Sequence, residues 1–148
     1  MNDTELIELL FILDVEDNWP PVSVEGLHCK NVGGSYQIKT APLFVKNISV
    51  NDVISVTFDR SGKVSSWQHV EKSKRSIVWL LRTKNTQCID DVLRGLRALS
   101  CNTVQLPQYG SYSIDIPEDL AIHKVDECLE RLNVDCVAIA YSSFRHEE

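Results

Sequence analysis

The sequence lacks the patterns that usually mark a chemical site. Its five cysteines stand singly, with no Cys-x-x-Cys pair and no zinc-like spacing, and its four histidines do not lie where they would serve a cysteine nucleophile. No other stretch carries a recognisable catalytic motif. We therefore expect a protein that is not an enzyme, with no catalytic residues, no cofactor and no metal, and with reduced, mostly buried cysteines.

Long hydrophobic runs are missing as well. The apolar run Leu9 to Leu13 is far too short to span a bilayer, and the first five residues are acidic where a secretory signal is basic. Glycine and proline are sparse, at 6 and 5 of 148 residues, and 43% of the residues are hydrophobic. These features predict a globular, cytoplasmic protein that does not enter a membrane.

Basic residues are absent from the first 29 positions. Seven acidic residues lie there: Asp3, Glu5, Glu8, Asp14, Glu16, Asp17 and Glu25. Residues 30–75 hold three acids and eight bases, a balance of +5, and residues 76–148 hold eleven acids and seven bases, a balance of −4. The sum of −7, +5 and −4 is the net charge of −6, so the acidity is concentrated at the amino end.

Part of this acidic segment is a candidate binding surface. A strand followed by a turn gathers Asp14, Glu16 and Asp17 beside Trp19, and Glu25 follows on the next predicted strand. Exposed charge with an aromatic anchor is typical of partner interfaces, so we predict that these five residues bind a partner. The alternative is a solubilising edge of the sheet.

The first half of the chain has the pattern of short strands and turns. Residues 6–15 suit either a helix or a strand, and we choose a strand from Leu9 to Val15. The next strand, Val22 to Lys30, is expected to place Val22 and Val24 inward, with Leu27 as a further candidate. Further strands are predicted over Ser35–Thr40, Leu43–Val45, Val53–Phe58 and Lys63–Val70. Turns are predicted at Gly33-Gly34 and at Asp59-Arg60-Ser61-Gly62. Six short strands at this spacing predict a small antiparallel β-barrel-like half over residues 1–75.

From Ser76 the pattern changes to alternating strands and helices, giving an α+β chain overall. The first predicted element is a buried strand, Ser76–Arg82, followed by a cap at Asn85–Thr86 and a helix with an apolar stripe from Ile89 to Leu99. A hairpin of Thr103–Leu106 and Ser111–Ile116 comes next. A second helix opens at Pro117, and a last strand covers Cys136–Tyr141. This βαββαβ order predicts a ferredoxin-like half over residues 76–148, with Ser76–Arg82 and Ser111–Ile116 as its central strands.

Two aromatic residues of this half, Trp79 and Tyr112, fall on its first and third predicted strands, where RNA-binding sheets stack bases. The segment carries a charge of −4, however, and phosphate contacts normally dominate affinity for nucleic acid. We interpret both side chains as packing residues and expect no direct binding of nucleic acid.

Several motifs occur in an uncommon order: Asn18-Trp19-Pro20-Pro21, Gly34-Ser35-Tyr36, Ala41-Pro42-Leu43-Phe44 and Ser49-Val50-Asn51-Asp52. With them the chain resembles the bacterial domain-of-unknown-function family numbered 4265, departing at Asn47, where that family's pattern suggests a small residue such as glycine. The resemblance implies no catalytic residues.

In size, acidity and cellular location the chain is also similar in type to the immunity proteins of contact-dependent growth inhibition systems, which bind and block a toxin. This likeness implies a protein that neutralises a cognate toxin, for example a nuclease, by covering its active site. The alternative is a small-molecule-sensing regulatory module of ferredoxin-like type, which binds ligands near the first strand-to-helix loop. That loop, Thr83–Gln87, has no glycine to bring the backbone close to a ligand.

Overall fold

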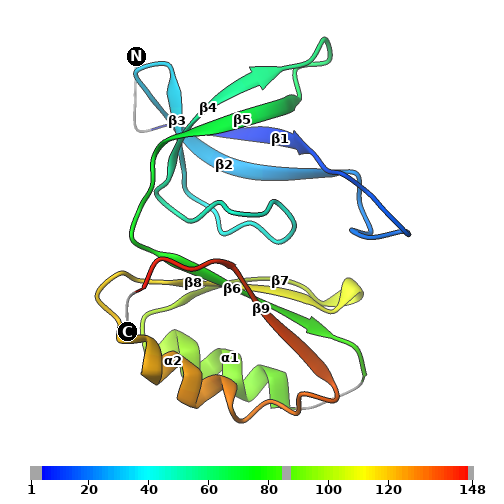
Figure 1. The fold of residues 1–148 in the computed structure, drawn as a ribbon, viewed down its shortest axis with the longest axis vertical. Coiled ribbons are helices and arrows are strands. Elements are labelled where there is room, and N and C mark those ends of the chain that lie inside the picture. Colours follow the sequence, from blue (N-terminus) through cyan, green and yellow to red (C-terminus); the bar gives the residue numbers. More distant parts are fainter. Residues whose placement is uncertain (1–4, 85–87, 147–148) are drawn as a thin grey trace. The chain divides into compact units, whose positions relative to one another are not determined.

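The computed structural model describes residues 5–84 and 88–146; the predicted cap at Asn85–Thr86 and most of the loop Thr83–Gln87 lie outside this range. The described residues form nine strands and two helices, a mixed α+β chain that divides into two compact units, Met1–Ser73 and Lys74–Glu148 (Figure 1). Neither described helix combines the length and the apolar character that crossing a membrane requires.

The first unit is a ring of five strands. They are β1 (Leu6–Ile12), β2 (Val24–Val32), β3 (Ser35–Ile38), β4 (Val53–Phe58) and β5 (Val64–Glu71). Successive strands pair antiparallel, and one parallel pair, Phe11 with Val64, joins β1 to β5 and closes the ring. Gly33 and Gly34, with φ of 66° and 90°, form the tight turn between β2 and β3 that the sequence predicts.

The core of this unit lies inside the ring. Its buried apolar residues are Leu9, Phe11, Leu27, Cys29, Ile38, Val45, Ile48, Ile54 and Val64. The strand choice for the N-terminal run is confirmed, although β1 begins at Leu6 and ends at Ile12. The predicted inward position of Val24 is wrong: Val24 pairs with the exposed Ile12, while its neighbour Glu25 is buried opposite Phe11.

The predicted strand at Leu43–Val45 is also wrong, because these residues lie in the loop between β3 and β4. Their three backbone N–H groups donate to the carboxylate of Glu25 and not to a neighbouring strand. A buried side chain thus provides the acceptors that a sheet would otherwise supply.

The second unit is a four-stranded sheet with two helices on one face (Figure 1). Its elements are β6 (Ser76–Arg82), α1 (Cys88–Ala98), β7 (Asn102–Leu106), β8 (Ser111–Ile116), α2 (Ile122–Leu129) and β9 (Val137–Ser143). The strand order is β7-β8-β6-β9, so β8 and β6 are central, as expected, and every pair is antiparallel. Apolar residues of both helices, including Leu93, Leu96 and Val125, pack with Val78, Leu80 and Ile114 of these strands in one core.

The second helix starts later than the sequence predicts. Pro117 opens a turn, in which the Leu120 N–H donates to the Pro117 carbonyl at 3.2 Å. Ala121 then has an extended backbone, and α2 begins at Ile122. Glu118 and Asp119 therefore precede the helix, and the predicted start at Pro117 is wrong.

Candidate functional site

The acidic tip of the first hairpin is shaped by a four-residue turn between β1 and β2. Glu16 and Trp19 exchange two backbone hydrogen bonds, each of 2.9 Å. Between them, Asp17 and Asn18 have φ of 53° and 64°, the left-handed pair of a type I′ turn. Asp and Asn tolerate this conformation better than most residues, which explains why they stand at these positions. Asp14, Glu16 and Asp17 are all exposed around this turn, so the structure brings the three predicted carboxylates together on one hairpin.

Trp19 is held on one side and open on the other. Its ring meets Phe44 edge-on, with centroids 5.9 Å apart and planes at 78°. Phe44 is 9% exposed, whereas Trp19 remains 44% exposed. A large ring that is fixed against the fold, yet still accessible, loses little conformational entropy on binding and suits an interface anchor.

Glu25 does not join this exposed group. Its side chain points inward, opposite Phe11, and is only 9% exposed. One oxygen accepts the Leu43 N–H at 2.6 Å, and the other accepts the N–H groups of Phe44 and Val45, both at 2.9 Å. Burial raises the pKa of Glu25 above its usual range, and the three hydrogen bonds oppose that rise. The structure thus assigns Glu25 to holding the loop that carries Phe44, and not to an exposed surface.

An apolar surface on the same hairpin was not predicted from the sequence. Leu10 and Ile12 are 38% and 46% exposed, while Leu9 and Phe11, on the other face of β1, are 6% and 2% exposed. Consecutive apolar residues from Leu9 to Ile12 were the available signal, because a strand with one solvated face should alternate with polar residues. The same run was responsible for the ambiguity between helix and strand.

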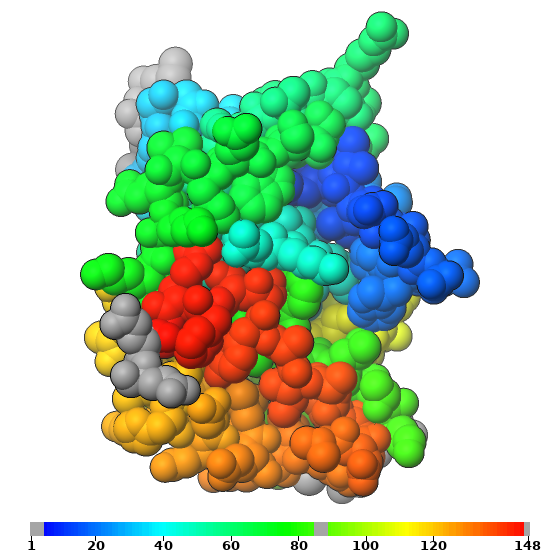
Figure 2. Space-filling model, viewed as in Figure 1, coloured from blue at the N-terminus to red at the C-terminus, as the bar shows by residue number. Residues whose placement is uncertain are grey.

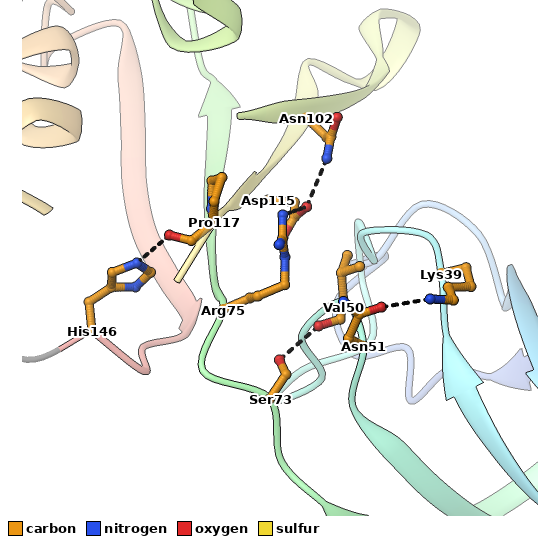
Figure 3. A network of polar contacts seen from close by, with 9 residues as sticks. All are labelled: Lys39, Val50, Asn51, Ser73, Arg75, Asn102, Asp115, Pro117 and His146. Carbon is orange, nitrogen blue, oxygen red and sulfur yellow. Dashed lines mark hydrogen bonds and ion pairs between the residues drawn. The ribbon is translucent and has the colours of Figure 1, made fainter. Parts of the chain in front are cut away.

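Other polar clusters of the described residues are structural. In the first unit, buried Asp52 accepts the N–H groups of Ser49 and Ser73 and contacts His69 Nε2 at 3.0 Å. Figure 3 shows the nearby bonds from Ser73 to Val50 and from Lys39 to Asn51. These contacts fix the loop that leads into β4.

In the second unit, Arg75 and Asp115 form a two-bond ion pair, with distances of 2.9 and 2.8 Å, and Asn102 donates to the same carboxylate at 3.0 Å (Figure 3). The pair is mostly buried and joins the segment before β6 to the central strand β8. Asp115 therefore accepts three N–H groups from two side chains of this unit.

One contact resembles a nucleophile and its base. Ser76 Oγ lies 2.6 Å from His146 Nδ1. His146 Nε2 lies 2.7 Å from the Pro117 carbonyl oxygen, the contact drawn in Figure 3. Ser76 is fully buried, however, and its Oγ also accepts the Arg145 N–H at 2.7 Å. The hydroxyl is thus closed to substrate and serves to attach the end of the chain to β6.

Within residues 5–84 and 88–146, no group of three or more His, Cys, Asp or Glu side chains is arranged to hold a metal ion. Trp79 is partly buried and Tyr112 is buried, with the Tyr112 hydroxyl accepting from Arg82 Nη1 at 3.2 Å. Tyr112 is thus a packing residue, as the charge of its segment suggests.

Comparison with known proteins places the chain in a family whose role is not assigned. A solved structure described as a novel crystal structure of a hypothetical protein from Neisseria gonorrhoeae is similar to it with a TM-score of 0.73 and 15% identity, covering 99% of this chain and 100% of the other. At that identity the likeness concerns the fold alone. No curated protein matches the sequence. The family model described as "Domain of unknown function (DUF4265)" matches residues 25–138, most of the chain, and the protein therefore belongs to that family.

Proposed function

We propose that the protein is a non-enzymatic immunity protein that binds a cognate bacterial toxin through the acidic tip of the β1–β2 hairpin. The observation that carries this proposal is the exposed group Asp14, Glu16 and Asp17 beside the half-exposed Trp19. These residues lie in a segment of 29 residues with no Lys or Arg.

The proposed mechanism is occlusion of the toxin's active site. A nuclease active site is built to receive phosphate and is rimmed by positive charge, so a projecting group of carboxylates fits it electrostatically. Long-range attraction between the two surfaces speeds their encounter, and the Trp19 ring supplies buried contact area once they meet. In this proposal the protein acts in the cytoplasm without a cofactor, and it touches neither nucleic acid nor a membrane.

We also propose a finer description of the fold. The closed ring β1-β2-β3-β4-β5 supports a small β-barrel for the first unit. In the second unit, the βαββαβ chain order together with the sheet order β7-β8-β6-β9 supports a ferredoxin-like arrangement.

The direct test is co-expression with the products of the neighbouring genes, followed by co-purification and an assay of the toxin activity of any protein that binds. We expect a stable complex and loss of the toxin's activity. The variant Asp14→Lys/Glu16→Lys/Asp17→Asn should associate more slowly and with weaker dependence on salt; Asn is used at position 17 because it tolerates the φ of 53°.

A matched control changes the net charge by the same +5 at exposed positions of the second unit: Glu127→Lys/Glu130→Lys/Asp135→Asn. We expect this control to alter the association rate much less. Failure of the wild-type protein to bind the product of any neighbouring gene would refute the proposed function. Equal rates for the two variants would place the contact on another surface.

A regulatory module that senses a small molecule is the second candidate, and the strand order of the second unit favours it. A thermal-shift screen against metabolites tests this function directly, since a ligand at a hundred times its Kd stabilises the folded state by about 2.7 kcal/mol. A clear shift together with failure to bind a toxin would favour this candidate.

A further inference from the structure

From Leu9 to Ile12, strand β1 is apolar on both faces, although only one face lies in the core. Leu9 and Phe11 point into the ring, whereas Leu10 and Ile12 point outward and stay 38% and 46% exposed. An antiparallel strand with one face in water normally alternates polar with apolar residues. Two apolar faces are the pattern of a strand that is covered on both sides.

The pairing of β1 with β2 defines the residues of this outer surface. Side chains at directly paired positions share a face, and the pairs are Leu10 with Gly26 and Ile12 with Val24. Val24 is half-buried, and Gly26 presents no side chain of its own beside Leu10. We call Leu10, Ile12, Val24 and Gly26 the outer hairpin face.

A carboxylate borders this face. Glu8 lies on the outward side of β1, and a Cβ built on Gly26 would come within 2.6 Å of Glu8 Oε2. The Glu8 carboxylate therefore lies across Gly26, next to Leu10. Asp14, exposed just beyond Ile12, adds a second negative charge at the other end of the strip.

The surrounding charge selects the kind of partner. A two-fold contact centred on Leu10 would bring Glu8 and Asp14 of one copy close to these carboxylates of the other, while Lys30 lies further off, beside Leu6. Like charges at an interface oppose association. An anionic lipid surface is repelled by the same carboxylates. A protein surface with Lys or Arg around an apolar side chain complements both the carboxylates and the strip between them.

We infer that the outer hairpin face is the apolar centre of the partner interface, and that it fits a cationic protein surface presenting an aliphatic or aromatic side chain to Leu10 and Ile12. This inference rests on the proposed function and adds residues that the acidic tip does not include. Figure 2 shows the N-terminal segment that forms this hairpin, in dark blue, lying open at the surface.

The two parts of the interface then have different kinetic roles. Exposed carboxylates act at long range and govern the association rate, while buried apolar contacts form only in the complex and govern the dissociation rate. Replacing Leu10 and Ile12 with serine should therefore raise the dissociation rate and leave the association rate nearly unchanged. The charge variants of the tip should lower the association rate and leave the dissociation rate nearly unchanged.

The experiment measures both rate constants against the cognate toxin by surface plasmon resonance. For Leu10→Ser/Ile12→Ser we expect Kd to rise at least about thirtyfold, equivalent to about 2 kcal/mol. The matched control is Val70→Ser, an apolar residue of β5 in the same unit that is 61% exposed, and we expect it to change Kd less than about twofold. Because two serines in one strand can weaken the fold, Ile12→Thr, which keeps a β-branched side chain, is measured as well, with circular dichroism of each variant.

Each result has one meaning. If the wild-type protein does not bind, the proposed function fails. If the wild type binds and Leu10→Ser/Ile12→Ser and Ile12→Thr bind equally well, the inference fails while the proposed function stands. Two other results would also overturn the inference. One is a dimer of the wild type alone in sedimentation that Leu10→Ser/Ile12→Ser dissociates, which would favour a second copy. The other is binding of the wild type to anionic phosphatidylserine vesicles that the same variant abolishes.

Discussion

Replacing Glu25 tests the three hydrogen bonds that hold the loop at Leu43–Val45. Glu25→Ala removes the acceptors that the structure gives the N–H groups of Leu43, Phe44 and Val45. Phe44 and Val45 are buried and Leu43 is partly buried, and each buried donor left without a partner costs about 1–3 kcal/mol. The loss is offset in part because a buried carboxylate no longer has to be desolvated, so we expect a net destabilisation of about 2–4 kcal/mol.

The assay is urea unfolding followed by circular dichroism, together with hydrogen exchange of the amides at positions 43–45. The exchange of these amides should accelerate strongly, since they lose their acceptor. Glu71→Ala, an exposed acid on β5, is the control, and a surface change of this kind should stay within about 0.5 kcal/mol. A loss below about 1 kcal/mol in Glu25→Ala, with amide exchange unchanged, would refute the structural role assigned to Glu25.

The pH dependence provides a second measure of the same group. Because burial raises the pKa of Glu25 above its ordinary 4.5, the folded protein holds this proton more tightly than the unfolded chain. The stabilisation that this proton supplies is complete below pH 4.5 and is lost as the pH rises through the folded pKa. The free energy of unfolding of the wild type minus that of Glu25→Gln should therefore fall as the pH rises from 4.5, and a difference that grows would contradict a raised pKa.

Two further predictions concern the cores of the units. Burial raises the pKa of the Cys29 and Cys101 thiols to about 12, so at pH 8 about one in ten thousand of each is thiolate. We therefore expect both thiols to resist iodoacetamide in the native protein and to react with it in urea. Rapid alkylation of the native protein would refute this. Asp115→Ala leaves the partly buried Arg75 without its two-bond partner and should destabilise the protein by about 3–5 kcal/mol in thermal or urea unfolding. Asp91→Ala, which breaks an exposed pair with Arg94, should lower stability by less than about 1 kcal/mol.

The sequence predicted those elements that local pattern determines. The apolar run Ser76–Arg82 is the central strand β6 over the same residues, and the helical stripe that starts at Ile89 is α1. Gly33-Gly34 and Asp59 to Gly62 mark turns whose φ values or hydrogen bonds depend on those residues. In each case the side chains of a few neighbouring residues decide the conformation, so no knowledge of distant contacts is needed.

The failures have a long-range cause. Leu43–Val45 looks like a strand because Leu, Phe and Val favour one, yet its backbone is bound by Glu25, which lies 18 to 20 residues earlier in the chain. The same contact explains why Glu25 does not belong with the exposed acids of the candidate site. A count of charges cannot tell a carboxylate in water from one that accepts three buried N–H groups.

The ambiguity of the N-terminal run has a different origin, and it connects the fold to the proposed interface. A strand is recognised by alternation, and Leu9-Leu10-Phe11-Ile12 does not alternate, because both of its faces are apolar. The ring covers only the face of Leu9 and Phe11. Polar residues that favour strands, such as Thr, would keep the strand at positions 10 and 12 and would improve solubility. The core of this unit therefore does not require apolar residues at positions 10 and 12, and the partner surface that we propose over Leu10 and Ile12 accounts for them.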